Sequence, residues 1–211
     1  MILKPVAHAL MRAVSRLVSI LGVERVSTRR TRVRALLAVL AACLVQTGLA
    51  QEYTKDGKML LPPDYRQWTF VTSGLGMTYS PAGSADSNPS FDNVFANPAA
   101  YKAFLQTGTW PEKTVLILEL RGSDSKVSIN QGGHVQADVV AIEAHVKDAR
   151  FPGGWAFFQF EKSDRASPTP MTATCYSCHQ QNGAVDTTFV QFYPTLREAA
   201  AKKGTFKATA K

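Results

Sequence analysis

The sequence predicts an α+β domain: a mostly antiparallel β-sheet with a few helices. Short segments rich in β-branched and aromatic residues recur between residues 67 and 160, and stretches rich in Gly, Pro, Ser and Asn separate them. Helical patterns occur only at residues 99–107 and near the C-terminus, so helices do not alternate regularly with strands. With 45% hydrophobic and 19% charged residues, the composition excludes a disordered chain, a collagen-like fibre and a multi-span membrane protein.

The expected elements follow in order along the chain. After an N-terminal arm at 51–64, strands are expected at 67–72, 91–95, 114–120, 138–147 and 155–160. The third is almost entirely apolar, which predicts a central place in the sheet. Asn97 and Pro98 begin a helix that Gly108 ends, and a second helix is expected over 186–203. Residues 73–90 and 122–137 are expected to form loops.

Residues 1–50 have the pattern of a secretory signal peptide. Four arginines (Arg29, Arg30, Arg32 and Arg34) precede an apolar run from Ala35 to Val45, and Ala50 ends a small-residue cleavage site. Eleven apolar residues are too few to cross a bilayer core of roughly 30 Å as a helix. The segment 40–43 also resembles a lipobox, in which Cys43 would carry a lipid anchor. Both alternatives place the domain, residues 51–211, in the periplasm.

The basic net charge of +8 belongs mainly to this leader. Residues 1–50 hold eight of the 24 basic residues and one of the 16 acidic residues, which leaves 16 basic and 15 acidic residues in the domain. A nearly neutral domain has no electrostatic footprint for a phosphate backbone, so no nucleic-acid partner is expected.

The segment Cys175-Tyr176-Ser177-Cys178-His179 carries the chemistry. Cys-x-x-Cys-His is the pattern of covalent haem c attachment: two thiols add to the two vinyl groups, and the histidine becomes the proximal iron ligand. The sequence therefore predicts one haem c, bound through Cys175 and Cys178, with His179 on the iron. A thioredoxin-like dithiol is disfavoured because a loop with two prolines, not a buried strand, precedes the motif, and a zinc knuckle would need two further ligands.

The sixth coordination position of the iron is expected to be open. The methionines of the domain lie in the arm (Met59), in a loop (Met77) and four residues before the motif (Met171), not on an element far downstream. His134 is expected to be solvated in a loop, and His145 to be a satisfied histidine on a strand rather than a second ligand.

Several further segments resemble the cytochrome P-460 family. They lie in order through nearly the whole domain: DYRQW at 64–68, NPAAY at 97–101, TWPEKTV at 109–115, VKDARF at 146–151, GWAF at 154–157, the haem motif, and FYPTLR at 192–197. The resemblance implies a mostly antiparallel β fold, a homodimer and a five-coordinate haem c with His179 as proximal ligand.

The family divides by chemistry. Its hydroxylamine-oxidising members carry a lysine cross-linked to the haem and are associated with a distal carboxylate. Leu118 stands at the position that matches the lysine, Lys113 and Lys126 only flank that strand, and no carboxylate can be assigned from residues 166–174. The chain therefore resembles the other branch, the cytochromes c′-beta, whose distal pocket is apolar.

Leu118, Leu116 or Ile117, Phe70 and Phe91 are the candidates for that pocket. An apolar pocket disfavours charged ligands and water and admits small neutral diatomics, so nitric oxide is the expected ligand. Two alternatives remain: an oxidoreductase acting on hydroxylamine or another small nitrogen compound, or showing peroxidase-like activity, and a periplasmic electron-transfer cytochrome with a sixth ligand such as Met171. Either redox function would require a periplasmic electron-transfer partner.

Overall fold

The computed structural model describes residues 51–79 and 88–207, all within one compact unit that runs from Leu49 to Lys211. The expected signal peptide at 1–50, with Cys43, lies outside the described residues. Among the described residues, no helix is both long and apolar enough to cross a membrane.

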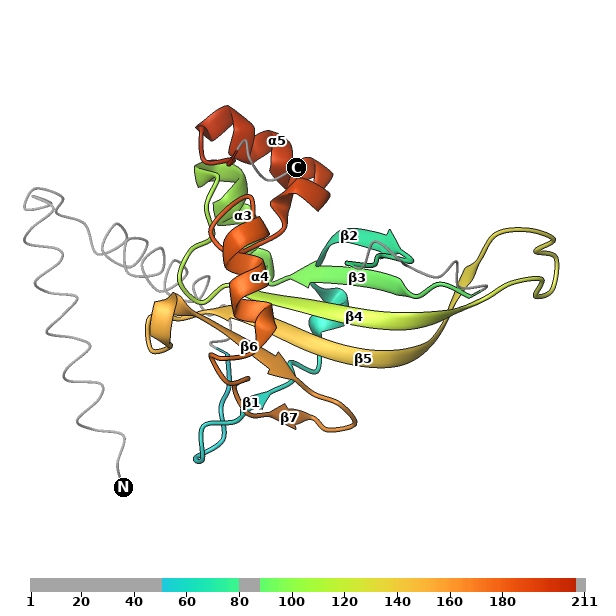
Figure 1. The fold of residues 1–211 in the computed structure, drawn as a ribbon, viewed down its shortest axis with the longest axis horizontal. Helices are drawn as coiled ribbons and strands as arrows, with labels where there is room; N and C mark the ends of the chain where they lie inside the picture. Colours follow the sequence, from blue (N-terminus) through green and yellow to red (C-terminus); the bar gives the residue numbers. More distant parts are fainter. Residues whose placement is uncertain (1–50, 80–87, 208–211) are drawn as a thin grey trace, which may run out of the picture. The chain divides into compact units, whose positions relative to one another are not determined.

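A five-stranded antiparallel sheet with strand order β2-β3-β4-β5-β6 forms the centre of the domain (Figure 1). Its strands are β2 (Thr69–Leu75), β3 (Phe91–Ala96), β4 (Val115–Asp124), β5 (Val135–Lys147) and β6 (Trp155–Gln159). A second sheet pairs β1 (Met59–Leu60) with β7 (Arg165–Ala166). The helices are α3 (Pro98–Thr107), α4 (Thr174–Asn182) and α5 (Pro194–Lys203), with 3-10 turns at Tyr65–Gln67, Pro152–Gly154 and Val190–Phe192. The predicted α+β class is confirmed, and β4 occupies the middle of the sheet.

Each face of the sheet carries its own hydrophobic core. On one face, α3, α5 and the segment 184–193 pack over Ala96, Leu116 and Trp155. On the other face, β1, β7 and the turn at Tyr65 pack against Ile117, Val146 and Phe158. In Figure 1, α3 and α5 lie above the sheet, α4 lies across its strands, and the small sheet of β1 and β7 lies below. Because both faces are covered, the apolar β6 is buried at Trp155–Phe158 and does not alternate in burial.

Helix α3 forms where the sequence predicts, between Pro98 and Gly108. Gly108 ends it with φ of 76°, in the left-handed region that glycine adopts without strain. Asn97 holds the cap position, but its side chain does not cap the helix. Its Oδ1 accepts a hydrogen bond from the Val115 amide at 2.9 Å, and its Nδ2 donates to the Lys113 carbonyl at 3.1 Å. Asn97 therefore fixes the helix to the first residue of β4.

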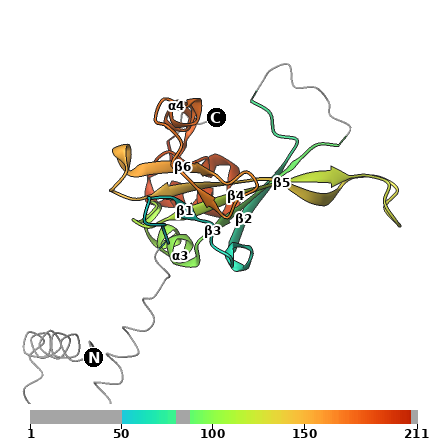
Figure 2. The same ribbon diagram turned by 90° about the horizontal axis from the view of Figure 1, so that it is seen from below.

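Two predicted loops are shorter than expected because their strands extend further. β2 begins at Thr69 and continues to Leu75, so the expected strand 67–72 is shifted towards the C-terminus. β4 and β5 together reach Asp124 and Val135, leaving a short connection where a loop at 122–137 was expected. The β4–β5 hairpin projects beyond the other strands in both views (Figures 1 and 2). Polar and Gly residues in these segments suggest a loop by composition, but ladder hydrogen bonds to the neighbouring strand keep them extended.

The C-terminal region also differs from the expected single helix at 186–203. The helix there, α5, begins only at Pro194, and the separate helix α4 carries the Cys-x-x-Cys-His segment. Pro194 occupies the first position of α5, where its missing amide hydrogen costs nothing, and this marks the true start.

Candidate functional site

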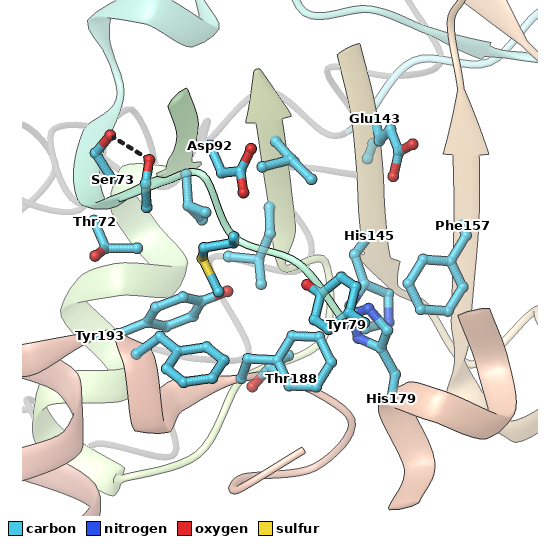
Figure 3. Close-up of a pocket in the computed structure, with 18 residues that line it drawn as sticks. Thr72, Ser73, Tyr79, Asp92, Glu143, His145, Phe157, His179, Thr188 and Tyr193 are labelled. Carbon is cyan, nitrogen blue, oxygen red and sulfur yellow. Dashed lines mark hydrogen bonds between the residues drawn. The ribbon is translucent and has the colours of Figure 1, made fainter. Parts of the chain in front are cut away.

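A cavity of about 320 Å³ lies on the helix-bearing face of the sheet (Figure 3). Strands β2 to β6 form its floor, with Thr72, Gly74, Asp92, Val94, Leu116, Leu118, Glu143, His145 and Phe157 among the lining residues. His179 of α4 and the segment after it, with Thr188, Phe189, Phe192 and Tyr193, close the other side. Met77 and Tyr79, which follow β2, complete the lining together with Ser73 and Ala144.

Strand alternation decides which predicted pocket residues reach this cavity. Leu116 and Leu118 both line it, whereas Ile117 points into the core of the opposite face. Phe70 and Phe91 are not among the lining residues. Phe70 pairs with Phe95, and Phe95 pairs with Ile117 on β4. Phe91 lies four positions before Phe95 on β3, so the two side chains share a face of the sheet. Both phenylalanines therefore belong to the face away from the cavity, and the side chain of Phe70 is 54% exposed.

His179 is oriented as an iron ligand requires. Its Nδ1 lies 2.8 Å from the carbonyl oxygen of Thr187, which fixes Nδ1 as the donor and leaves Nε2 free to bind a metal. Within the described residues, Nε2 has no hydrogen-bond partner. Burial lowers the pKa of His179 and outweighs the opposing effect of the Thr187 carbonyl, which favours the neutral ring.

The two thiols lie close to this histidine on the same helix. Cys175 and Cys178 are free, partly buried and three positions apart, which places them on one side of α4. Burial raises the pKa of the Cys175 thiol. A redox-active Cys-x-x-Cys pair usually has a lowered thiol pKa, so this shift argues against a thioredoxin-like dithiol even though the motif opens a helix.

His145 is the nearest histidine to His179, with ring centroids 5.0 Å apart. It is 7% exposed, stacks on Phe157 at 4.0 Å and 11°, and has Nε2 3.3 Å from the Thr187 hydroxyl oxygen. Burial, followed by the neighbouring His179, lowers its pKa well below the usual value. His145 is thus packed and hydrogen-bonded, beside the proposed ligand. His134 lies far along the hairpin, half-buried, with Nδ1 3.4 Å from the Ser123 hydroxyl.

Two carboxylates also line the cavity, which sequence reasoning missed. Asp92 on β3 and Glu143 on β5 are both labelled in Figure 3. Glu143 pairs directly with Leu118, whereas Asp92 pairs with Leu120, two residues further along β4. Burial, with a smaller effect of Glu143, raises the pKa of Asp92. The cavity is therefore lined by two acidic side chains in addition to its apolar residues. Alternation within the predicted strands could have revealed both residues, since each lies an even number of positions from a pocket-facing neighbour.

No lysine is among the residues that line the cavity within the described chain. Lys113 forms an ion pair with Asp148 at 2.6 Å, at the start of β4, and Lys126 lies in the β4–β5 connection. Met171 is 48% exposed and lies outside the lining, whereas Met77 contributes to it. At the position expected for a cross-linking lysine, the aliphatic side chain of Leu118 lines the cavity.

A family model described as Cytochrome P460 matches residues 62–190. The chain belongs to the cytochrome P460 family. The matched segment contains the whole sheet from β2 to β6 and helix α4 with the Cys-x-x-Cys-His motif. No curated protein matches the chain significantly. Membership of the cytochrome P460 family implies a haem cofactor.

The residues around the cavity fit a haem. The described residues contain no cluster of three or more His, Cys, Asp or Glu side chains that could hold a metal ion by themselves. One half-buried histidine, His179, with a free Nε2 at the edge of a largely apolar cavity, instead suits a metal whose remaining ligands come from a porphyrin. His179 would hold the iron from α4, and β3, β4 and β5 would face the macrocycle.

Proposed function

We propose that this protein is a periplasmic cytochrome that binds or scavenges nitric oxide at one haem c. Cys175 and Cys178 hold the haem through thioether bonds, and His179 is its proximal ligand. A ferrous haem held in this way supplies an open coordination position for a small neutral ligand. Leu116, Leu118 and Val94 present aliphatic carbon on the floor of the cavity, which disfavours the entry of ordered water and anions.

The lining by Leu118 is the observation that carries this proposal. At this position the hydroxylamine-oxidising members of the family carry a lysine joined to the haem, and a leucine side chain has no nitrogen with which to form that bond. Among the described residues, no lysine lines the cavity. Without the cross-link, the macrocycle keeps ordinary haem c electronics, and ligand binding becomes the function that the site supports best.

The experiment is an anaerobic titration of the reduced holoprotein with nitric oxide, followed by absorption spectroscopy. The Leu118→Lys variant provides the matched comparison, because it places an amine at the position in question. We expect the wild-type protein to give an ordinary ferrous c-type spectrum that shifts with nitric oxide. A reduced wild-type spectrum that nitric oxide leaves unchanged would contradict the proposal.

A second candidate, oxidation of hydroxylamine, is favoured by Asp92 and Glu143. A carboxylate with a raised pKa beside a reacting nitrogen is suited to accept the protons that such an oxidation releases. Steady-state oxidation of hydroxylamine with an artificial electron acceptor tests this candidate. If it is correct, Asp92→Asn lowers the rate about 100-fold, the effect expected of a lost general base. A wild-type rate no faster than that of free haem would exclude it.

The electron-transfer role and the homodimer differ in the support that the structure gives them. An electron-transfer role with Met171 as sixth ligand has little support, because Met171 lies outside the cavity lining. A homodimer has better support. Exposed apolar side chains follow the β4–β5 hairpin: Val127, Ile129, Val135, Val139 and Val140, of which Ile129 is 93% exposed. Such a row of apolar residues is typical of a surface that a second subunit covers.

A further inference from the structure

The carbonyl that orients His179 belongs to a tight turn anchored from outside the cavity. We propose that Lys147 and Trp110, which do not line the cavity, are positioning residues. They hold the Thr187 carbonyl close to Nδ1 of His179 and so set the strength of the iron–histidine bond. This inference rests on the proposed role of His179 as the haem ligand.

The turn itself is closed by short backbone hydrogen bonds. The Thr188 amide donates to the Val185 carbonyl at 2.9 Å, and the Ala184 amide donates to the Thr188 carbonyl at 2.9 Å. Gly183 lets the turn lie directly on the end of α4. A Cβ atom at this glycine would come within 2.6 Å of the His179 carbonyl oxygen and 2.8 Å of the Thr187 carbonyl carbon. A side chain at position 183 would therefore separate the backbone of Thr187 from the end of α4.

Lys147, the last residue of β5, holds the turn from the sheet. Its Nζ donates to Oδ2 of Asp186 at 3.0 Å and to the backbone carbonyl of Trp110 at 2.8 Å. The side chains of Lys147 and Asp186 are only 21% and 30% exposed, so this ion pair is less screened than a fully exposed one. Asp186 is adjacent to Thr187, and the ion pair thus fixes the turn one residue away from the carbonyl that His179 uses.

Trp110 holds the turn from its other end. Its indole Nε1 donates to Oγ1 of Thr188 at 2.8 Å, and this hydroxyl in turn donates to the Val185 carbonyl at 2.8 Å. The indole is 2% exposed and packs against Phe104 of α3 at 4.5 Å between ring centroids. Both anchors converge on Trp110, because the same residue also accepts the hydrogen bond from Lys147. The turn cannot move away from His179 without breaking a buried contact.

The consequence for the haem follows from the hydrogen bond at Nδ1. A carbonyl held close to Nδ1–H makes the imidazole a stronger electron donor, which strengthens its bond to iron and favours the ferric state. A turn released from Lys147 or Trp110 would hold this carbonyl less closely. The iron–histidine bond would weaken, and the reduction potential would rise.

The test compares the wild-type holoprotein with Lys147→Met and Trp110→Phe, each of which removes one donor and retains the apolar contacts. Lys113→Met is the matched control: it also breaks one ion pair at the adjoining ends of β4 and β5, but Lys113 does not contact the turn. The measurements are the iron–histidine stretching band of the ferrous protein, by resonance Raman spectroscopy, and the reduction potential.

We expect a lower band frequency and a more positive potential in both variants, with wild-type values in the control. Should Trp110→Phe fail to fold, Lys147→Met decides by itself. A wild-type band that Lys147→Met leaves unchanged, or that Lys113→Met shifts equally, would overturn this inference alone. The absence of any iron–histidine band in the wild-type protein, or its persistence in His179→Ala, would overturn the proposed function and this inference together.

Discussion

The choice between the two proposed functions depends mainly on a single side chain, Leu118. Its neighbours across the sheet are Val94 on β3 and Glu143 on β5, so the residue lies between an aliphatic and an acidic position of the floor. Replacing Leu118 changes a side chain that would face a bound macrocycle, and does not alter the sequence of helix α4, which carries His179.

Leu118→Lys is therefore expected to move the protein towards the cross-linked members of its family. The amine would lie where their lysine lies. Attachment replaces a hydrogen of the ring by the lysine nitrogen, which requires a two-electron oxidant such as added hydrogen peroxide, and would displace the ferrous absorption bands far to the red. Absorption spectra of the reduced variant, and its mass after digestion, measure this outcome. Leu118→Met, which is similar in volume but has no amine, serves as the control and should keep an ordinary c-type spectrum. A shift of equal size in Leu118→Met would show that packing, not the amine, is responsible.

Asp148 illustrates a carboxylate with a structural role, in contrast to Asp92 and Glu143. It is 2% exposed and accepts hydrogen bonds from the side chains of Arg150 and Lys113. The Arg150 hydrogen bonds, with Lys113, hold the pKa of Asp148 well below its usual value despite the opposing effect of burial. A depressed pKa means that the charged form stabilises the fold above the unfolded pKa, near 4, and that this stabilisation is lost as the pH falls below it.

We expect Asp148→Asn to lower the free energy of unfolding at pH 7 by about 2 kcal/mol, the size of a lost hydrogen bond to a charged group. At pH 3 the difference from wild type should be smaller, because the Asp148 carboxylate of the unfolded wild-type chain then takes up protons while that of the folded protein stays charged, which removes part of the stabilisation. Urea unfolding curves at the two pH values measure this. An equal difference at both pH values would contradict the assigned role.

The two carboxylates of the cavity floor also show the limits of reading a single chain residue by residue. The haem motif could be predicted because its chemistry is local: three residues within five positions specify thiols and ligand. Asp92 and Glu143 are 51 residues apart in sequence and meet only through the pairing of β3, β4 and β5. Phe70 and Phe91 were predicted as pocket residues from their type, which does not give the face of a strand, and both lie on the face away from this cavity.

At the scale of elements, the helix ends were the features that sequence predicted best. Pro98 and Gly108 bound α3 because one fixes φ and the other accepts a positive φ, both properties of the residue itself. Helix α4 was missed, because its composition, TCYSCHQQN, has neither a strong apolar stripe nor a capping side chain. Its helical form depends instead on contacts outside the helix, such as the Tyr176 hydroxyl that donates to the Thr169 carbonyl.

Gly108 and Gly204 offer a matched comparison of helix ends. Both follow a helix with φ above 70°, but only Gly108 is crowded: a Cβ there would lie 2.7 Å from Cβ of Lys203 and from Oγ1 of Thr205. Gly204→Ala should cost about 1 kcal/mol of stability, from backbone strain alone. Gly108→Ala should cost more than about 2 kcal/mol, because α3 and α5 must also separate. Thermal unfolding of the two variants measures the difference, and equal losses would mean that α5 does not pack against Gly108 as described.

At the scale of the whole molecule, the projecting β4–β5 hairpin is the feature least explained by a monomer. Its exposed valines and Ile129 have no cover within the described chain, although the base of the same hairpin is packed on both faces. Nδ2 of the buried Asn93 on β3 donates to Oε1 of the exposed Gln136 on β5 at 2.9 Å, and this hydrogen bond holds the hairpin in line with the sheet.

If a second copy covers this hairpin, Val140→Lys should convert the dimer to a monomer without loss of haem. Val140 is 67% exposed. A lysine at this position would be solvated in a monomer but would place a charge in an apolar interface. Sedimentation velocity at micromolar protein concentration gives the state of each form. Thr107→Lys, on α3 and away from the hairpin, is the control. A monomeric wild-type protein would show that the hairpin serves another purpose.

We propose that His179 and the cavity floor around Leu118 form a haem site that has no cross-link and is open to nitric oxide. The absorption spectrum of the purified ferrous protein, recorded before and after the addition of nitric oxide, tests it most directly. We expect an ordinary high-spin c-type spectrum that shifts when nitric oxide is added. A ferrous band displaced far to the red in the wild-type protein would mean a cross-linked macrocycle, and would contradict the assignment of Leu118.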